Sequence, residues 1–404
     1  MAELKTQGAM QIGLSRRARS LEISPTTAVP QEANRLKRQG IDVIEFGVGE
    51  PDFPTPDNIK EAAHRAIREN FTKYTDVGGI PALKDALADR YRRDWGADYG
   101  AQQIIVCAGG KQALFNLALA LFDEGDEVVI PSPYWVTFPE QVRLAGATPV
   151  VLPVPERERF ILRAAMLEPA LTERTKAVII NSPSNPTGAV IPEGEMRKLV
   201  ALARDRNVLL ISDETYEYFS YQTDRAFSAS ALWKETPDTL IIVSAVSKTY
   251  SMTGWRIGYA LGPKSIIAAA ANIQSHATSN PVSISQKAAL EAIVGDQASV
   301  GRMKAEYRRR RDFAQAALAR IPGVQCDLPD GAFYLFPNIG RYFRGAITDS
   351  VALAKYLLAE ARVAVVPGSA FGAEGYVRVS YATSLEMLEE GIRRMGEALG
   401  KISS

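Results

Sequence analysis

Cysteine and histidine are scarce in this sequence of 404 residues, which contains two of each. Cys107 and Cys326 lie far apart in apolar or mixed surroundings, so we expect free thiols and no disulfide framework. His64 and His276 form no cluster with the cysteines, and the spacing typical of a metal site is absent. His64 falls in a helical run and is expected at the surface. We therefore predict no metal.

Long apolar runs and an excess of either charge are also missing. No apolar segment approaches the ~20 residues that a bilayer-spanning helix needs, and residues 1–20 lack the apolar core of a signal peptide. Lys and Arg number 47 against 46 Asp and Glu, which disfavours a nucleic-acid or membrane partner. The basic cluster Tyr307–Asp312 lies in an amphipathic helical pattern and predicts a solvated helix face. We expect a cytoplasmic protein.

Apolar runs rich in β-branched residues alternate with helix-period segments through the middle of the chain. Runs that are apolar on both faces, separated by helices, are typical of a mostly parallel α/β sheet. The predicted strands begin at Ile104, Glu127, Thr148, Lys176, Val208 and Thr239. Short alternating strands among helices in the C-terminal part indicate a smaller α+β unit. A chain of this length also exceeds one ordinary core. We predict a large domain at 57–305 and a small domain formed by 1–56 and 306–404.

Several predicted strands end in residues that can bind a ligand. Gly109 and Gly110 link a strand to a helix, where free N–H groups attract an anion, although such a pair alone is typical of a simple turn. The spacing of a nucleotide P-loop is absent. Asp213 ends another strand, where it could simply cap a helix. Lys248 and Arg256 follow a third strand, and partial burial of Lys248 lowers its pKa.

Taken together, these residues describe a single ligand. Lys248 suits an aldehyde, Arg256 and the glycine turn suit a phosphate, and Asp213 suits a basic ring nitrogen. Pyridoxal 5′-phosphate carries all three groups.

Four ordered motifs give the sequence a family resemblance. They are "NPTG" at Asn185–Gly188, "SDETY" at Ser212–Tyr216, "SKTYSMTGWRIGY" at Ser247–Tyr259 and "VRVSYA" at Val377–Ala382. The sequence resembles the class I aminotransferases, and "GGKQALFN" and "SPYWVTFPE" resemble their bacterial aspartate aminotransferase branch. The resemblance spans nearly the whole chain and implies the fold type I architecture, pyridoxal phosphate as cofactor and a homodimer.

The resemblance implies a role for each matched residue. Lys248 would form the Schiff base and move the Cα proton of the substrate, Asp213 would keep the ring nitrogen protonated, and Tyr216 would hydrogen-bond the phenolic oxygen of the cofactor. The other implied cofactor contacts are Gly109, Gly110, Lys111, Trp135, Asn185, Ser247 and Arg256, and Tyr74 would reach the phosphate in the partner subunit. Arg378 would grip the substrate α-carboxylate, with Gly49, Lys111, Trp135 and Asn185 as further substrate contacts.

The implied reaction is ping-pong transfer of the amino group from L-aspartate to 2-oxoglutarate. Lys111, with Ser24 and Thr26 of the N-terminal segment, would favour an acidic side chain, since 272–286 lacks the arginine that serves this purpose in enteric and animal enzymes. Ala245 also departs from the pattern, because many relatives have a phosphate-binding serine there.

Three alternatives stay open. Prephenate, aromatic or alanine aminotransferases share the cofactor residues, and so do some C–S lyases and synthases of this fold. A non-catalytic regulator that binds the cofactor is the third, more remote alternative.

Overall fold

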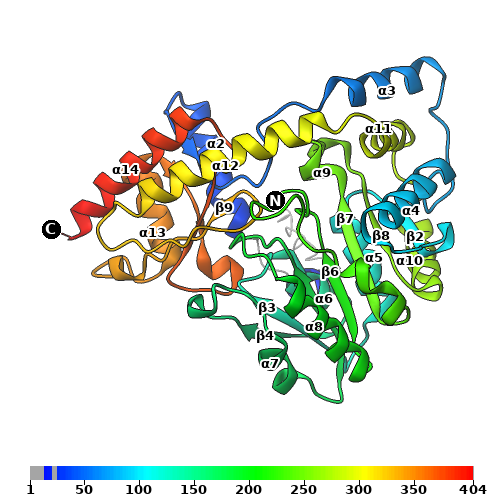
Figure 1. Ribbon diagram of the computed structural model, residues 1–404. Coiled ribbons are helices and arrows are strands. Elements are labelled where there is room, and N and C mark those ends of the chain that lie inside the picture. Colours follow the sequence, from blue (N-terminus) through cyan, green and yellow to red (C-terminus); the bar gives the residue numbers. More distant parts are fainter. Residues whose placement is uncertain (1–12, 21–24, 404) are drawn as a thin grey trace, which may run out of the picture.

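A computed structural model describes residues 13–20 and 25–403 (Figure 1). Its centre is a seven-stranded sheet with the order β2-β8-β7-β6-β5-β3-β4. The strands are β2 (Ile104–Cys107), β3 (Glu127–Ser132), β4 (Thr148–Pro153), β5 (Thr175–Asn181), β6 (Leu209–Asp213), β7 (Leu240–Ala245) and β8 (Gly258–Leu261). Strand β8 runs antiparallel to both of its neighbours, β2 and β7. All the other neighbouring strands of this sheet are parallel. The predicted α/β fold class is confirmed.

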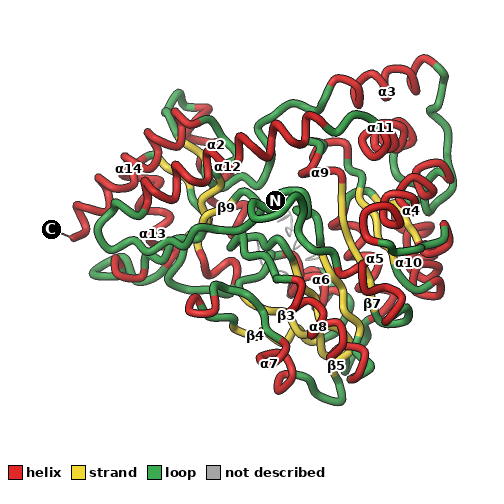
Figure 2. Tube along the Cα trace, in the orientation of Figure 1, coloured by secondary structure: helices red, strands yellow, loops and turns green. Residues whose placement is uncertain are grey.

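Helices cover both faces of this sheet, as Figure 2 shows. One face packs against α5 (Gly110–Leu121), α6 (Thr137–Leu144) and α10 (Lys264–Ala277). The other packs against α4 (Pro81–Trp95), α8 (Glu193–Asp205) and α11 (Ser283–Val294), with α3 (Asp57–Arg68) beside α11. Because helices cover both faces, every residue of β7 is buried. Strands buried on both faces read as nearly continuous apolar runs.

A second unit gathers the C-terminal part of the chain and residues near the N-terminus. Its strands are β9 (Tyr334–Leu335), β11 (Val366–Pro367) and β12 (Val377–Ser380) in one antiparallel sheet, with β1 (Ile44–Glu45) parallel to β10 (Val363–Ala364). Its helices are α2 (Pro25–Arg38), α12 (Ala298–Leu318), α13 (Ser350–Tyr356) and α14 (Leu385–Ser403). The other α-helices of the described residues are short: α1 (Arg16–Ser20), α7 (Ala164–Leu167) and α9 (Val246–Thr249).

Helix α12, yellow in Figure 1, runs from the sheet-bearing unit into this second unit. It crosses the predicted border between residues 305 and 306 without interruption. Ile44 and Phe46 belong to the same hydrophobic cluster as residues of α12, α14 and β12. The domain limits themselves stay a prediction.

The solvated face predicted for the basic cluster of α12 is wrong for two of its arginines. Arg310 and Arg311 are buried. Arg310 donates to both oxygens of Asp52 at 2.8 and 2.9 Å, and Arg311 donates to Pro329 O at 2.9 Å. Arg308 and Arg309 keep the expected exposure. An arginine can be buried on an amphipathic helix when each N–H group finds an acceptor, and a sequence pattern does not show the acceptors.

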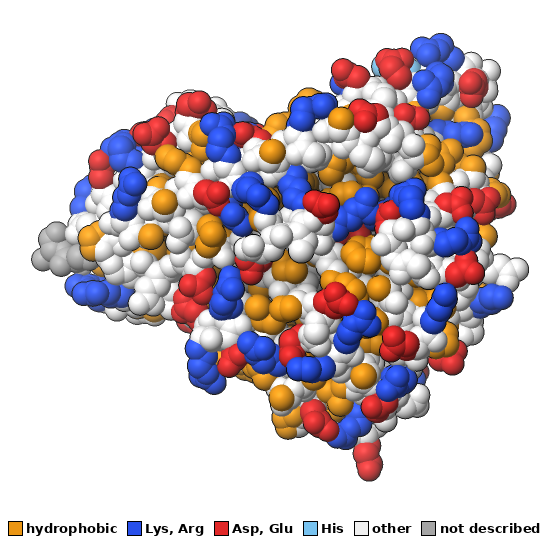
Figure 3. Space-filling view, in the orientation of Figure 1, with side chains coloured by type: hydrophobic (Ala, Val, Ile, Leu, Met, Phe, Trp, Pro, Cys, Tyr) orange, Lys and Arg blue, Asp and Glu red, His pale blue; other side chains and the backbone are white. Residues whose placement is uncertain are grey.

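Charges of both signs are interspersed over the face shown in Figure 3. Cys107 and Cys326 are free thiols, and His64 is exposed beside Glu61. Within 13–20 and 25–403, no helix is long and apolar enough to span a bilayer, and no three His, Cys, Asp or Glu side chains gather as a metal site.

Candidate active site

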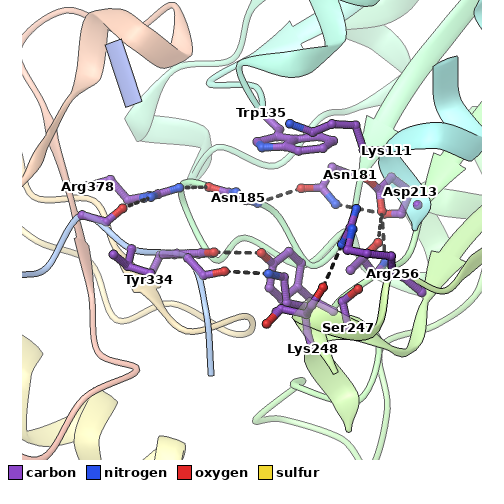
Figure 4. A pocket seen from close by; sticks show the side chains of 18 residues that line it. Lys111, Trp135, Asn181, Asn185, Asp213, Ser247, Lys248, Arg256, Tyr334 and Arg378 are labelled. Carbon is purple, nitrogen blue, oxygen red and sulfur yellow. Dashed lines mark hydrogen bonds between the residues drawn. The ribbon is translucent and has the colours of Figure 1, made fainter. Parts of the chain in front are cut away.

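A cavity of about 490 Å³ opens where β5, β6 and β7 end, between the large sheet and the second unit. Ligands bind at this carboxyl edge in open α/β sheets. The residues predicted from the sequence that line it are Gly49, Gly110, Lys111, Trp135, Asn185, Asp213, Tyr216, Ser247, Lys248, Arg256 and Arg378. Figure 4 shows their side chains converging from both units.

Lys248 follows β7 in the short helix α9. Its Nζ donates a 2.6 Å hydrogen bond to the backbone oxygen of Gly49. Burial, helped by the nearby charges of Arg378, Arg256 and Lys111 and opposed by Glu50, lowers the pKa of Lys248 to about 8. A sizeable fraction of the amine is therefore neutral near pH 7 to 8, as a nucleophile or general base requires.

Asp213 is the last residue of β6 and is buried. Its Oδ1 accepts hydrogen bonds from Thr215 N at 3.0 Å and Thr215 Oγ1 at 2.7 Å. Burial raises the pKa of Asp213 to about 6, although the two bonds from Thr215 oppose the rise. Its Oδ2 has no hydrogen-bond partner among the described residues, so this oxygen is available to a protonated ring nitrogen.

A cluster of anion-binding groups lies at the start of α5. Gly109 has a φ of +93°, and a Cβ there would collide with the guanidinium of Arg256. A Cβ on Gly258 would likewise collide with the backbone of Gly110. Because Gly109 and Gly258 have no side chain, the Arg256 guanidinium and the first turn of α5 lie close together. Ser247 lines the same cavity. This donor set suits a phosphate.

Arg378 lies on β12 and is buried, on the opposite side of the cavity. Its Nη1 donates to Asn185 Oδ1 at 2.8 Å and its Nη2 to Gly47 O at 2.7 Å. Its Nε is buried with no hydrogen-bond partner, and burial lowers the pKa of Arg378. It forms no ion pair within the described residues. A buried guanidinium held only by neutral acceptors is costly, so the arrangement favours an anionic ligand.

Lys111 and Trp135 line the cavity and contact each other. The Lys111 Nζ lies 4.9 Å from the centre of the Trp135 ring, an attractive arrangement of a cation and an aromatic face. Burial lowers the pKa of Lys111, and Arg256 lowers it further. Trp135 packs edge to face on Phe138 at 5.5 Å, which holds its ring beside the cavity.

Some predicted residues lie elsewhere. Tyr74 is 89% exposed and does not line the cavity of its own chain. Gly109 lies in the loop directly before α5 and does not line the cavity itself. Ser24 lies outside the described residues, and so does the side chain of Thr26.

The cavity also contains residues that the sequence reasoning did not assign to the site. They are Gly47, Val48, Asn181, Thr215, Thr253 and Tyr334, together with Ala245, noted above as a departure. Asn181 accepts from Asn185 N at 2.7 Å and donates to Asp213 O at 3.0 Å, so it ties two predicted residues together. Thr215 stands inside the "SDETY" motif and could have been found there. Tyr334 stands in an ordinary strand pattern that carries no such signal.

Comparison with known proteins identifies the family. Residues 41–395 match the family described as Aminotransferase class I and II. The chain belongs to this family. This aminotransferase is 48% identical over 384 residues to an aspartate aminotransferase of Geobacillus stearothermophilus, covering 95% of this chain and 98% of the relative. It is 45% identical to a probable aspartate/prephenate aminotransferase of Aquifex aeolicus (strain VF5), over 97% of this chain and 100% of the relative.

Solved structures agree with this assignment. The aspartate aminotransferase of Thermus thermophilus with maleate has a TM-score of 0.91 and 43% identity, covering 96% of this chain and 100% of that one. An aspartate aminotransferase from Rhizobium meliloti has a TM-score of 0.92 and 39% identity, over 96% and 99%. Enzymes of this family depend on pyridoxal 5′-phosphate. The cavity suits that cofactor because it supplies an amine, a carboxylate oxygen without a partner among the described residues and an anion-binding helix start.

Proposed function

We propose that this aminotransferase transfers the amino group of L-aspartate to 2-oxoglutarate. The observation that carries the proposal is the pair of cations on different sides of one cavity, Arg378 and Lys111. Aspartate and 2-oxoglutarate both have a carboxylate at each end, so two cations match them better than they match alanine or phenylalanine. When bound, the cofactor supplies a carbonyl carbon for amines and a ring that withdraws electrons from the substrate Cα.

The proposed work of the protein is divided among residues with distinct surroundings. Arg378 binds the α-carboxylate through its fork, with Asn185 fixing the orientation of the guanidinium. Lys248 would take the proton from the substrate Cα on its Nζ and deliver it to the C4′ carbon of the cofactor, because its lowered pKa keeps the amine neutral part of the time. Asp213 presents its free oxygen to the ring nitrogen of the cofactor and stabilises positive charge there.

Names of the relatives support the choice of an acidic substrate. The Geobacillus relative is called an aspartate aminotransferase, and the Thermus structure contains maleate, which is a four-carbon dicarboxylate like aspartate. A specific observation also favours prephenate as a second candidate, since the Aquifex relative is called aspartate/prephenate. Prephenate carries two carboxylates as well, so the same pair of cations suits it.

A substrate panel tests the proposal. Aspartate, phenylalanine and alanine are assayed as donors with 2-oxoglutarate, and prephenate as an acceptor with aspartate. We expect aspartate to exceed phenylalanine and alanine in kcat/KM by at least about tenfold, the effect of one charge-assisted contact. If phenylalanine or alanine is preferred to aspartate by a wide margin, the aspartate assignment is wrong, and a wide preference for prephenate over 2-oxoglutarate would overturn the assignment of the acceptor. Absence of any turnover would instead favour a non-catalytic binding protein.

Lys111 provides a matched pair of variants for the same panel. Lys111→Gln should lower kcat/KM for aspartate by roughly 10- to 100-fold while changing that for alanine less, since only aspartate has a second carboxylate. Lys198→Gln removes a lysine from an exposed pair with Glu195 and should leave both values unchanged. An equal loss for aspartate and alanine would contradict a contact with the side-chain carboxylate.

We also propose that the enzyme is a cytoplasmic homodimer with Tyr74 reaching the cofactor phosphate in the partner subunit. Tyr74 is 89% exposed, so its hydroxyl is accessible to a second chain. Arg256, next to the predicted phosphate site, is exposed as well. A hydroxyl donor from a second chain would complete that end of the cavity.

A further inference from the structure

Tyr334 lies in the cavity wall and has no role in the reaction as described so far. Its side chain is fully buried, with 0% exposure. Its hydroxyl lies 2.8 Å from the hydroxyl of Tyr216. The guanidinium carbon of Arg378 lies 4.5 Å from the centre of its ring. Tyr334 therefore contacts a residue proposed to bind the cofactor and another proposed to bind the substrate. Figure 4 shows Tyr334 on the same side of the cavity as Arg378.

The position of the Tyr334 hydroxyl is tightly determined. A Cβ on Gly49 would collide with this hydroxyl, so the oxygen occupies the space that the glycine leaves. The carbonyl of the same glycine accepts the hydrogen bond from Lys248 Nζ. The ring packs edge to face on Tyr216 at 5.8 Å. These contacts hold the two phenols together beside the lysine.

The direction of the bond between the two phenols follows from counting protons. Burial raises the pKa of Tyr334, and it raises that of Tyr216 more strongly, so both phenols keep their single proton at neutral pH. Within the described residues, Tyr216 is the only hydrogen-bond partner of the Tyr334 hydroxyl. Tyr216 has an acceptor of its own in the proposed site, namely the phenolic oxygen of the cofactor. Once it donates there, its oxygen can only accept from Tyr334.

We propose that Tyr334 is a positioning residue that donates to Tyr216 and so strengthens Tyr216 as a donor to the phenolic oxygen of pyridoxal phosphate. A hydroxyl that accepts a hydrogen bond becomes a better donor, because bonds in a chain polarise one another. The proposal rests on the proposed role of Tyr216. It gives the residue a function beyond packing, since a phenylalanine would fill the same space and face Arg378 equally well.

The test uses the purified, cofactor-loaded enzyme and the pH midpoint of the visible absorbance of the bound cofactor. Donation to the phenolic oxygen favours its deprotonated form, so weaker donation moves this midpoint upward. Tyr334→Phe should raise the midpoint by roughly 0.3 to 1 pH unit, the size expected for loss of one neutral hydrogen bond. Tyr216→Phe should raise it further. In the Tyr216→Phe background, the second substitution should add nothing, because the chain is already broken.

Each other outcome overturns the proposal. An unchanged midpoint in Tyr334→Phe, alongside a shift in Tyr216→Phe, would show that the hydroxyl only packs. Equal shifts from Tyr334→Phe in both backgrounds would show that it acts independently of Tyr216. No shift in Tyr216→Phe would remove the role of Tyr216 and the proposal together.

Tyr381→Phe is the matched control for these measurements. Tyr381 is another buried tyrosine, and its hydroxyl donates to Ala332 O at 3.1 Å, away from the cavity. This variant should keep the wild-type midpoint, and a shift as large as that of Tyr334→Phe would overturn the proposal. The absorbance is read without substrate, so a failure of the aspartate assignment is detected separately by the substrate panel.

Discussion

Lys248 shows how burial prepares a single side chain for chemistry. A lysine that folding moves from water into a crowded, cationic cavity is harder to protonate, and its pKa falls from 10.5 to about 8. The same burial makes Lys248 a cost to the stability of the cofactor-free protein at neutral pH. Between pH 8 and 10.5 the unfolded chain binds more protons at this residue than the folded chain, so this cost declines as the pH rises.

The lowered pKa of Lys248 predicts that the effect of Lys248→Met on stability depends on pH. The cofactor-free variant should be more stable than the cofactor-free wild type at pH 7, and this gain should shrink as the pH rises from 8 towards 10.5. Urea denaturation of both proteins at pH 7 and pH 10 measures the difference in free energy of unfolding. A gain of the same size at both values would contradict a lowered pKa for Lys248.

The conformation of the loop before α5 predicts an effect of Gly109→Ala on cofactor binding. Gly109→Ala should weaken cofactor binding by about tenfold or more, because the added Cβ meets Arg256 and φ is +93°. Gly254→Ala is the control, since a Cβ there has nothing within 4 Å. Cofactor titration of the two apoproteins gives the dissociation constants. Equal constants for the two variants would show that the approach of Arg256 to this loop is not needed.

Helix α12 offers a matched pair of arginines. Arg310→Ala should lower the free energy of unfolding by roughly 1 to 3 kcal/mol, since it leaves Asp52 and Glu306 without their buried partner. Arg309→Ala removes an exposed partner of the same Glu306 and should leave the free energy of unfolding nearly unchanged. Chemical denaturation compares them, and equal losses would indicate that burial of Arg310 contributes nothing.

The elements of the large sheet could be predicted further than those of the second unit. The six predicted strands were long apolar runs, and their alternation with helices is confirmed by the central sheet. Strand β8 was not predicted, because four residues among glycines give little periodic signal. The buried arginines of α12 were missed because their acceptors, Asp52 and Pro329, lie far away in the sequence.

The residues of the candidate site, too, could be predicted only in part from the sequence. Lys248, Asp213 and Arg256 could be placed because each follows a recognisable strand end. Tyr334 could not, since its importance comes from the Tyr216 hydroxyl 2.8 Å away, which belongs to a distant part of the chain. Contacts between the two units depend on tertiary packing and leave no trace in local sequence.

At the scale of the whole molecule, the proposed homodimer predicts that defective subunits complement each other. Lys248→Ala and Tyr74→Ala homodimers should each have little activity. After the two proteins are mixed, unfolded and refolded together, activity should rise to about a quarter of the wild-type value, because half of the random dimers are hybrids with one intact site. Activity no greater than the average of the two parents would contradict a site shared between subunits.

We have proposed that this aminotransferase acts on aspartate, with Lys248 as its proton carrier. The most direct measurement mixes the cofactor-loaded enzyme with aspartate and no acceptor, and then adds 2-oxoglutarate. We predict one equivalent of oxaloacetate per site in the first step and glutamate in the second, both slowed at least about a thousandfold in Lys248→Ala. Release of ammonia, or no oxaloacetate from the wild-type enzyme, would show that the chain does not transaminate aspartate.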